Sequence, residues 1–195
     1  MLADGRNSYI RSPPNNNPVK DINSGAIKCN VNDRKLGNWV NAKAGDTLTF
    51  EWYHNSRGDE IIDTSHKGPV IAYIAEANNE NSWTKISQDG LSNGQWAVDK
   101  LISAQGKQQV KIPSSLKAGD YIIRAEIIAL HEGESSYQSN PVRGAQFYPS
   151  CSQVRITQGG SASPPGGVTF PGTYTFQDPG ILFNIYTKPP PTSYP

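Results

Sequence analysis

The sequence has no long apolar run and no excess of charge of one sign. No window holds the roughly 18 consecutive apolar residues that a membrane span requires. Lys and Arg number 18 and Asp and Glu number 17 among 195 residues, which leaves a formal net charge of +1. So balanced a charge gives no strong attraction to nucleic acid or to anionic lipid. We therefore expect neither nucleic acid nor a membrane among the partners.

Cysteine is also scarce. The only two, Cys29 and Cys151, lie far apart in the sequence. They are either two buried thiols or one disulfide that closes a long loop, and a structural disulfide indicates an oxidising compartment. The first residues lack the basic and apolar blocks of a signal peptide, which conflicts with that compartment. This conflict suggests that the printed start is not the native start.

Glycine, proline, asparagine and serine are abundant, and they separate short segments with the alternation of strands. Such segments cover residues 47–54, 69–77, 109–113, 121–130 and 152–157. In the first of them, Leu48, Phe50 and Trp52 fall on one face. Residues 96–105 could form a short helix, and no long amphipathic helix is present. The pattern predicts an all-β protein, an immunoglobulin- or fibronectin-III-like β-sandwich with long loops and little helix.

The last residues differ in composition. Residues 188–195 are rich in proline, which cannot donate to a central strand. We expect one sandwich domain over residues 1–187, followed by an extended Pro-rich tail over 188–195.

Motifs of common hydrolases and nucleotide-binding proteins are absent. Glu132 and Glu134 could act as a glycosidase pair only if their loop placed them across one bond. His66 precedes a predicted strand and His131 follows another. Gln146 and Tyr148 alternate on one side of a short strand. These side chains could surround a metal ion, although a surface histidine and a core tyrosine are the simpler interpretations.

The arrangement of segments is more specific. In chain order it reads "YIRSPPNNNPVKDI", "CNVND", "AGDTLTFEWYHN", "SHKGPVIAYIA", "WAVDKLI", "AGDYIIRAEIIALHE", "NPVRGAQFYPSC" and "DPGILFNIY". The sequence thereby resembles the lytic polysaccharide monooxygenases of auxiliary activity family nine, formerly glycoside hydrolase family sixty-one. The resemblance implies a secreted, extracellular, monomeric β-sandwich with a flat face. It also implies copper-dependent oxidative cleavage of β-1,4-glucan at C1 or C4.

Such an enzyme uses dioxygen or hydrogen peroxide and an external electron donor. Cellulose is the implied substrate, with xyloglucan or cello-oligosaccharides beside it. In the family the copper is held by the amino-terminal histidine and a second histidine. By resemblance His66 is that second ligand and Tyr148 is the axial phenol. His131 and Gln146 resemble the pair that hydrogen-bonds bound oxygen species.

The resemblance assigns further roles. It pairs Cys29 with Cys151 in a disulfide. It assigns polysaccharide contacts to Asn16, His54, Asn55, Ser65, Glu132, Glu134, Arg143 and Tyr194. The polar groups would meet sugar hydroxyls, and the Tyr194 ring would stack on a pyranose.

The opening of the chain departs from the family pattern. Family members begin with histidine and a first strand before a segment like "DGRNSYIRSPP", which here starts at Asp4. We therefore expect the first strand, roughly a dozen residues, and its histidine to be missing, with weak copper binding as the result. The alternative is a non-catalytic polysaccharide-binding sandwich derived from such an enzyme. A purely structural immunoglobulin-like module is a third possibility.

Overall fold

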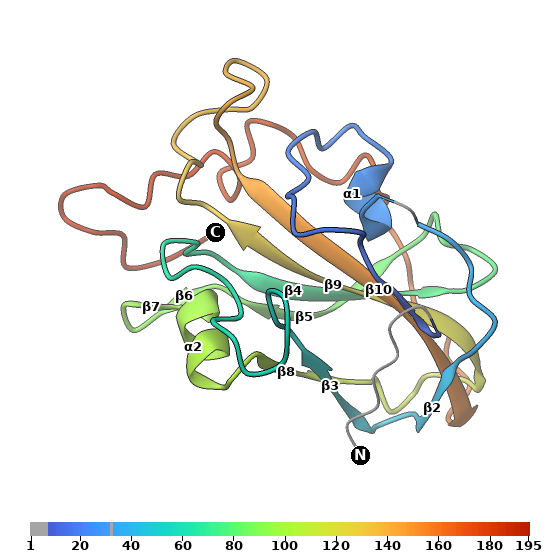
Figure 1. The fold of residues 1–195 in the computed structure, drawn as a ribbon. Coiled ribbons are helices and arrows are strands. Elements are labelled where there is room, and N and C mark those ends of the chain that lie inside the picture. Colours follow the sequence, from blue (N-terminus) through green and yellow to red (C-terminus); the bar gives the residue numbers. More distant parts are fainter. Residues whose placement is uncertain (1–7, 32) are drawn as a thin grey trace.

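Two β-sheets of unequal size form the protein, which a computed structural model describes over residues 8–31 and 33–195 (Figure 1). The larger, six-stranded sheet has the order β1-β10-β9-β4-β5, with β2 pairing in parallel to β10. Its strands are β1 (Ile10–Arg11), β2 (Val40–Lys43), β4 (Val70–Glu76), β5 (Thr84–Asp89), β9 (Gly119–Ala129) and β10 (Gln146–Gln158). The smaller sheet pairs β3 (Thr47–Glu51) with β8 (Lys107–Lys111). The sheets pack as a β-sandwich, which confirms the predicted fold class.

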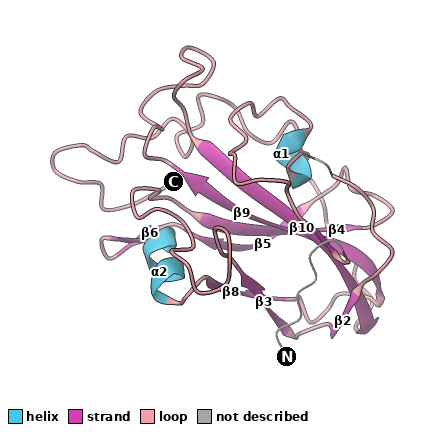
Figure 2. Cartoon of the chain, viewed as in Figure 1, coloured by secondary structure: helices cyan, strands magenta, loops and turns pink. Residues whose placement is uncertain are grey.

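The remaining elements are short and lie outside the two main sheets (Figure 2). They are the hairpin of β6 (Leu91–Ser92) and β7 (Gln95–Trp96) and the helices α1 (Ala26–Cys29) and α2 (Ala97–Ser103). No helix among the described residues is both long and apolar enough to cross a membrane. The predictions about the opening of the chain fall on residues 1–7 and on what would precede them, outside the described residues.

Both faces of the large sheet are covered. On β9, Ile122 and Ile128 pack into one apolar cluster, whereas Tyr121 and Ile123 pack into a second. Since successive side chains of a strand point to opposite faces, this division shows that the central strand is buried on both sides. The long apolar runs seen in the sequence therefore suit their position.

The predicted alternation along β3 is confirmed only in part. Leu48 and Phe50 pack against the cluster that contains Ile123. Trp52 lies beyond the end of β3 and packs instead against the cluster that contains Val98 of α2. The change occurs because β3 ends at Glu51, so its alternation does not extend to Trp52.

The disulfide between Cys29 and Cys151 is present and links α1 to β10 across 122 residues of sequence. Both cysteines are completely buried. The two-thiol interpretation is therefore wrong.

The start of β4, the end of β9 and the start of β10 lie at the same end of the large sheet. Val70 at the start of β4 pairs with Ile127, and Gln146 at the start of β10 pairs with Ala129 at the end of β9. The loop before β4 and the long loop between β9 and β10 therefore meet at the same edge. The histidines of both loops lie there.

Candidate functional site

The loop that carries His66 is fastened to the end of β9. The Lys67 carbonyl accepts a hydrogen bond from the Leu130 amide at 2.8 Å, and the Pro69 carbonyl accepts one from the Ile128 amide at 3.1 Å. Between them, Gly68 lies so close to β9 that an added Cβ would stand 1.8 Å from the Ile128 carbonyl oxygen. The glycine of "SHKGP" is therefore required for this contact.

Replacing Gly68 with alanine should lower the free energy of unfolding by about 1–3 kcal/mol, because the backbone must move to relieve the clash. The same movement should separate His66 from His131. Urea unfolding measures the first effect and the NMR chemical shifts of the two imidazoles measure the second. Gly37→Ala is the matched control, since an added Cβ there has no atom within 4 Å. Unchanged imidazole shifts in Gly68→Ala would show that the glycine does not position His66.

The fastened loops bring two imidazoles and a phenol together. The ring centroids of His66 and His131 are 4.0 Å apart, and those of His66 and Tyr148 are 6.0 Å apart. His131 Nδ1 is buried and has no hydrogen-bond partner among the described residues. These three rings, with Gln146, form the cluster that we call the histidine cluster.

A chain of hydrogen bonds connects the phenol to Lys20 through Gln146 and Glu132. The Tyr148 hydroxyl donates to Gln146 Oε1 at 2.7 Å, and Gln146 Nε2 donates to Glu132 Oε2 at 3.0 Å. The same carboxylate oxygen accepts from Lys20 Nζ at 3.0 Å. Burial raises the pKa of Glu132, but the bonds from Lys20 and Gln146 outweigh it and lower the pKa overall. Glu132 is thus held as a carboxylate.

Burial sets the protonation of the cluster. It lowers the pKa of His66, with a further contribution from the charge of His131, and it also lowers the pKa of His131. Burial, together with the charge of Glu132, raises the pKa of Tyr148 to about 12. At neutral pH both imidazoles are uncharged, the form that binds metals, and the phenol keeps its proton.

The described residues contain few side chains that could bind a metal ion. Within residues 8–31 and 33–195, no three His, Cys, Asp or Glu side chains are grouped to hold a metal ion. His66 offers an uncharged ring nitrogen and Tyr148 offers a weak oxygen donor. Such a donor set suits copper, which favours imidazole ligands, but it needs further nitrogen ligands to bind the ion tightly.

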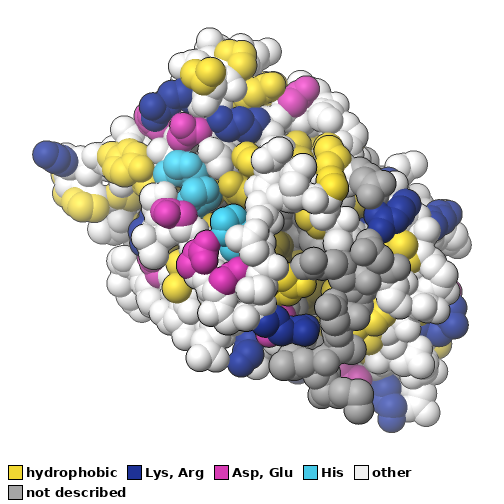
Figure 3. Space-filling model, in the orientation of Figure 1, with side chains coloured by type: hydrophobic (Ala, Val, Ile, Leu, Met, Phe, Trp, Pro, Cys, Tyr) yellow, Lys and Arg dark blue, Asp and Glu magenta, His cyan; other side chains and the backbone are white. Residues whose placement is uncertain are grey.

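Polar side chains surround the cluster on one face of the molecule, where the histidines and several acidic residues gather (Figure 3). His54 is linked to Asn55, with Nδ1 and Nδ2 3.3 Å apart, and Asn16 Nδ2 donates to Asn55 Oδ1 at 3.2 Å. Glu60 Oε1 contacts the same ring nitrogen, 2.6 Å from His54 Nδ1. With the exposed Ser65, these groups present donors and acceptors beside His66.

The other charged candidates are paired within the protein. Arg143 forms an ion pair with Glu134, while Glu132 binds Lys20 and Gln146. The two glutamates have separate partners, so nothing in this arrangement favours a glycosidase pair. The predicted contacts of Glu132, Glu134 and Arg143 with sugar stay predictions.

A ring that stacks on a sugar must be open to solvent, whereas the Tyr194 ring is packed against other aromatic side chains. Its ring packs against Trp96 and Phe183, each at 5.5 Å between centroids, and its hydroxyl donates to the Gly180 carbonyl at 2.6 Å. The residue with an open ring is Tyr186, which is 59% exposed and donates to the His131 carbonyl at 3.2 Å. The sequence does not single out Tyr186, because several tyrosines lie in this region and nothing local distinguishes the exposed one.

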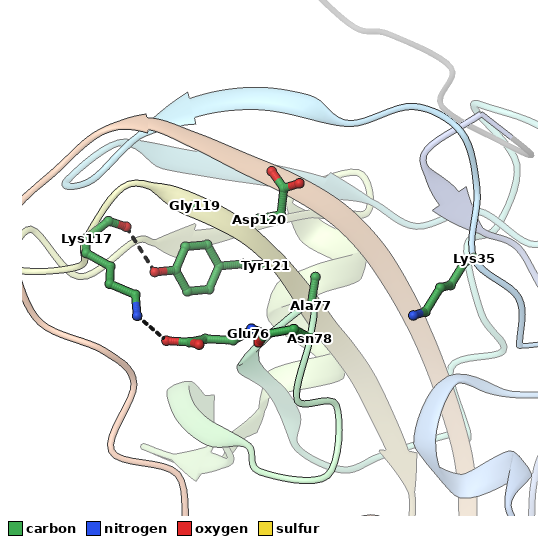
Figure 4. A pocket seen from close by; sticks show the side chains of 8 residues that line it. All are labelled: Lys35, Glu76, Ala77, Asn78, Lys117, Gly119, Asp120 and Tyr121. Carbon is green, nitrogen blue, oxygen red and sulfur yellow. Dashed lines mark hydrogen bonds and ion pairs between the residues drawn. The ribbon is translucent and has the colours of Figure 1, made fainter.

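A cavity of about 580 Å³ lies at the opposite end of the large sheet (Figure 4). Its lining includes Glu76, where β4 ends, and Gly119, where β9 begins, whereas the histidines flank the other ends of these strands. Lys117 is ion-paired with Glu76 at 2.8 Å, and its carbonyl accepts from the Tyr121 hydroxyl at 2.9 Å. This cavity contains no histidine and is separate from the candidate site.

Known proteins have a similar fold and a similar sequence. The family model of auxiliary activity family 9 (formerly GH61) matches residues 3–194. A lytic polysaccharide monooxygenase A of that family from Schizophyllum commune is 53% identical over 190 residues, covering 94% of this chain and 76% of the relative. Its counterpart from Phanerochaete carnosa is 49% identical over 195 residues, covering 98% and 73%. The solved structure of CvAA9A matches with a TM-score of 0.94 at 46% identity, over 98% of this chain and 88% of that one. The chain therefore belongs to auxiliary activity family 9, the lytic polysaccharide monooxygenases, whose members cleave polysaccharides oxidatively.

Proposed function

We propose that this protein is a copper-dependent monooxygenase that cleaves β-1,4-glucan, cellulose above all, by hydroxylation at C1 or C4. The observation that carries the proposal is the histidine cluster, in which an uncharged His66 ring lies beside His131 and Tyr148 on a face rich in polar groups. Family membership supports copper as the metal. The disulfide supports secretion, since such bonds persist in oxidising compartments.

In this proposal His66 would supply a ring nitrogen to copper and Tyr148 a weak oxygen donor. The sequence contains three histidines, His54, His66 and His131. The amino-terminal histidine that the resemblance implies is not one of them. Bound copper, reduced by an external donor, supplies the activation of dioxygen or hydrogen peroxide. His131 and Gln146 orient the oxygen species through hydrogen bonds, and the buried phenol keeps its proton because its pKa is raised.

The polar face binds the substrate. Asn16, His54, Asn55 and Ser65 offer hydrogen-bonding groups on one side of His66. Tyr186 presents an open ring whose hydroxyl is bonded to the backbone of His131. A pyranose ring stacked on Tyr186 would hold its chain across the cluster.

Product analysis tests the proposal. The 195-residue chain, and a form extended by a histidine-initiated first strand, are incubated with cello-oligosaccharides, copper, ascorbate and oxygen. Mass spectrometry should find oxidised fragments when the extended form is used. The mass of these fragments and their chemical stability distinguish C1 from C4 oxidation. We expect the 195-residue chain to bind copper more weakly, because its described donors are incomplete. The absence of oxidised products from the copper-loaded extended form would contradict the proposal.

Replacing Tyr186 with alanine should weaken oligosaccharide binding by about 1–3 kcal/mol, the range that stacking on one aromatic ring contributes to nucleic-acid bases. Isothermal titration with cellohexaose measures the change. Tyr194→Phe is the control, since it keeps the packed ring and removes only the bond to Gly180. Equal affinity in Tyr186→Ala and the parent protein would remove Tyr186 from the substrate face.

A second candidate is a polysaccharide-binding sandwich without a redox centre. It is favoured by the incomplete donor set among the described residues. Binding of cellulose that is equal with and without copper, together with no oxidised product from either form, would select it.

A further inference from the structure

Lys20 lies at the far end of the hydrogen-bonded chain that starts at Tyr148. Its backbone is held beside β10, because Val19 and Phe147 exchange two backbone hydrogen bonds of 2.8 Å. Its ammonium group donates to Glu132 Oε2 at 3.0 Å and to the Val142 carbonyl at 2.8 Å. One lysine thus fastens both ends of the loop between β9 and β10 to the start of β10.

The direction of the Gln146 amide depends on Glu132. A carboxylate only accepts hydrogen bonds, so Glu132 must face the amide nitrogen of Gln146. The amide oxygen then faces Tyr148 and accepts its hydroxyl hydrogen. Because Glu132 Oε2 serves both Lys20 and Gln146, the lysine determines where that oxygen lies.

We propose that Lys20 is a positioning residue, which fixes the carboxylate of Glu132 and through it the directions of the Gln146 amide and the Tyr148 hydroxyl. The catalytic meaning of this arrangement rests on the proposed function, in which Gln146 orients oxygen. Without Lys20, the Glu132 carboxylate turns towards water and the amide is free to reverse. A reversed Gln146 would turn its oxygen towards Glu132 and its nitrogen towards Tyr148, so the Tyr148 hydroxyl would lose its acceptor.

The test observes Gln146 directly, in the metal-free protein. The side-chain amide of Gln146 is followed by ¹⁵N–¹H NMR in the parent protein and in Lys20→Met. We expect its bonded proton to move upfield, towards the position of exposed glutamine amides, and its exchange with water to become faster. Lys20→Arg should restore the parent signal, because a guanidinium can reach both acceptors.

Lys28→Met is the matched control. The Lys28 side chain is 24% exposed, close to the 19% of Lys20, and it forms its own ion pair with Asp33. Its loss should leave the Gln146 signal unchanged. A Gln146 signal unchanged in Lys20→Met, or changed equally in Lys28→Met, would overturn the proposal.

A second variant, at Glu132, tests the same connection between Lys20 and Gln146. Glu132→Gln should shift the Gln146 signal by itself, and Lys20→Met added to it should have no further effect, because the connecting carboxylate is gone. An additive effect would show that Lys20 acts on Gln146 by another route. Since these signals need no copper and no turnover, they stand or fall independently of the oxidative activity.

Discussion

Replacing Cys29 and Cys151 with serine should lower the free energy of unfolding by about 5 kcal/mol. The bridge closes a loop of 122 residues, and a cross-link stabilises mainly by restricting the unfolded chain, the more so for a longer loop. This estimate is the full chain-entropy value, and it approaches the whole stability of a typical domain. The double variant is therefore expected to be largely unfolded at body temperature.

Urea unfolding of the parent and double variant, followed by tryptophan fluorescence, measures this loss. The parent protein kept in excess reductant provides the control, because it breaks the same bond without changing the sequence. The reduced parent and the serine variant should unfold at similar urea concentrations. A change below about 1 kcal/mol in both would contradict the chain-entropy account.

Replacing Arg124 with methionine should cost about 3–5 kcal/mol, because the partner carboxylate would be left buried without its charge partner. Arg124 and Glu126 are both fully buried and form an ion pair at 2.6 Å. The guanidinium also donates to the carbonyls of Ile27 and Lys28 at the end of α1, and it lies 3.9 Å from the centre of the Phe170 ring. The Arg124 guanidinium thus bonds both to the buried carboxylate of Glu126 and to carbonyl groups at the end of α1.

Arg155→Met is the matched control. Arg155 pairs with Asp120 at 2.6 Å, but both side chains are more than one third exposed, so its loss should change stability far less than the loss of Arg124. Equal losses in Arg124→Met and Arg155→Met would show that burial does not decide the effect. Because Arg124 binds α1 next to Cys29, its loss and that of the disulfide should not be additive.

The strand pattern was readable because it depends on local alternation. The apolar runs that became β4 and β9 are long enough to be buried on both faces, and turn residues mark their ends. For Trp52, local alternation does not predict the packing partner. Its place in the alternation was clear, but the cluster that it joins depends on where β3 ends and α2 begins.

For the candidate site, resemblance to a family named most of the residues and the structure supplied their connections. His66, His131, Gln146 and Tyr148 were all named from "SHKGP", "ALHE" and "GAQFYPSC". Tyr186 and Lys20 were not. Both act through partners far along the chain, at separations of 55 residues for Tyr186 and 112 for Lys20.

The sequence by itself determined the fold class, the short elements and a set of chemically capable side chains, because alternation and turn chemistry are written residue by residue. The tertiary structure settles which cysteine state holds, which tyrosine is open to solvent and which lysine bonds to Glu132. These outcomes follow from strand register and from the packing of the carboxyl-terminal segment against Trp96. Both are contacts between distant residues, and no local pattern encodes them.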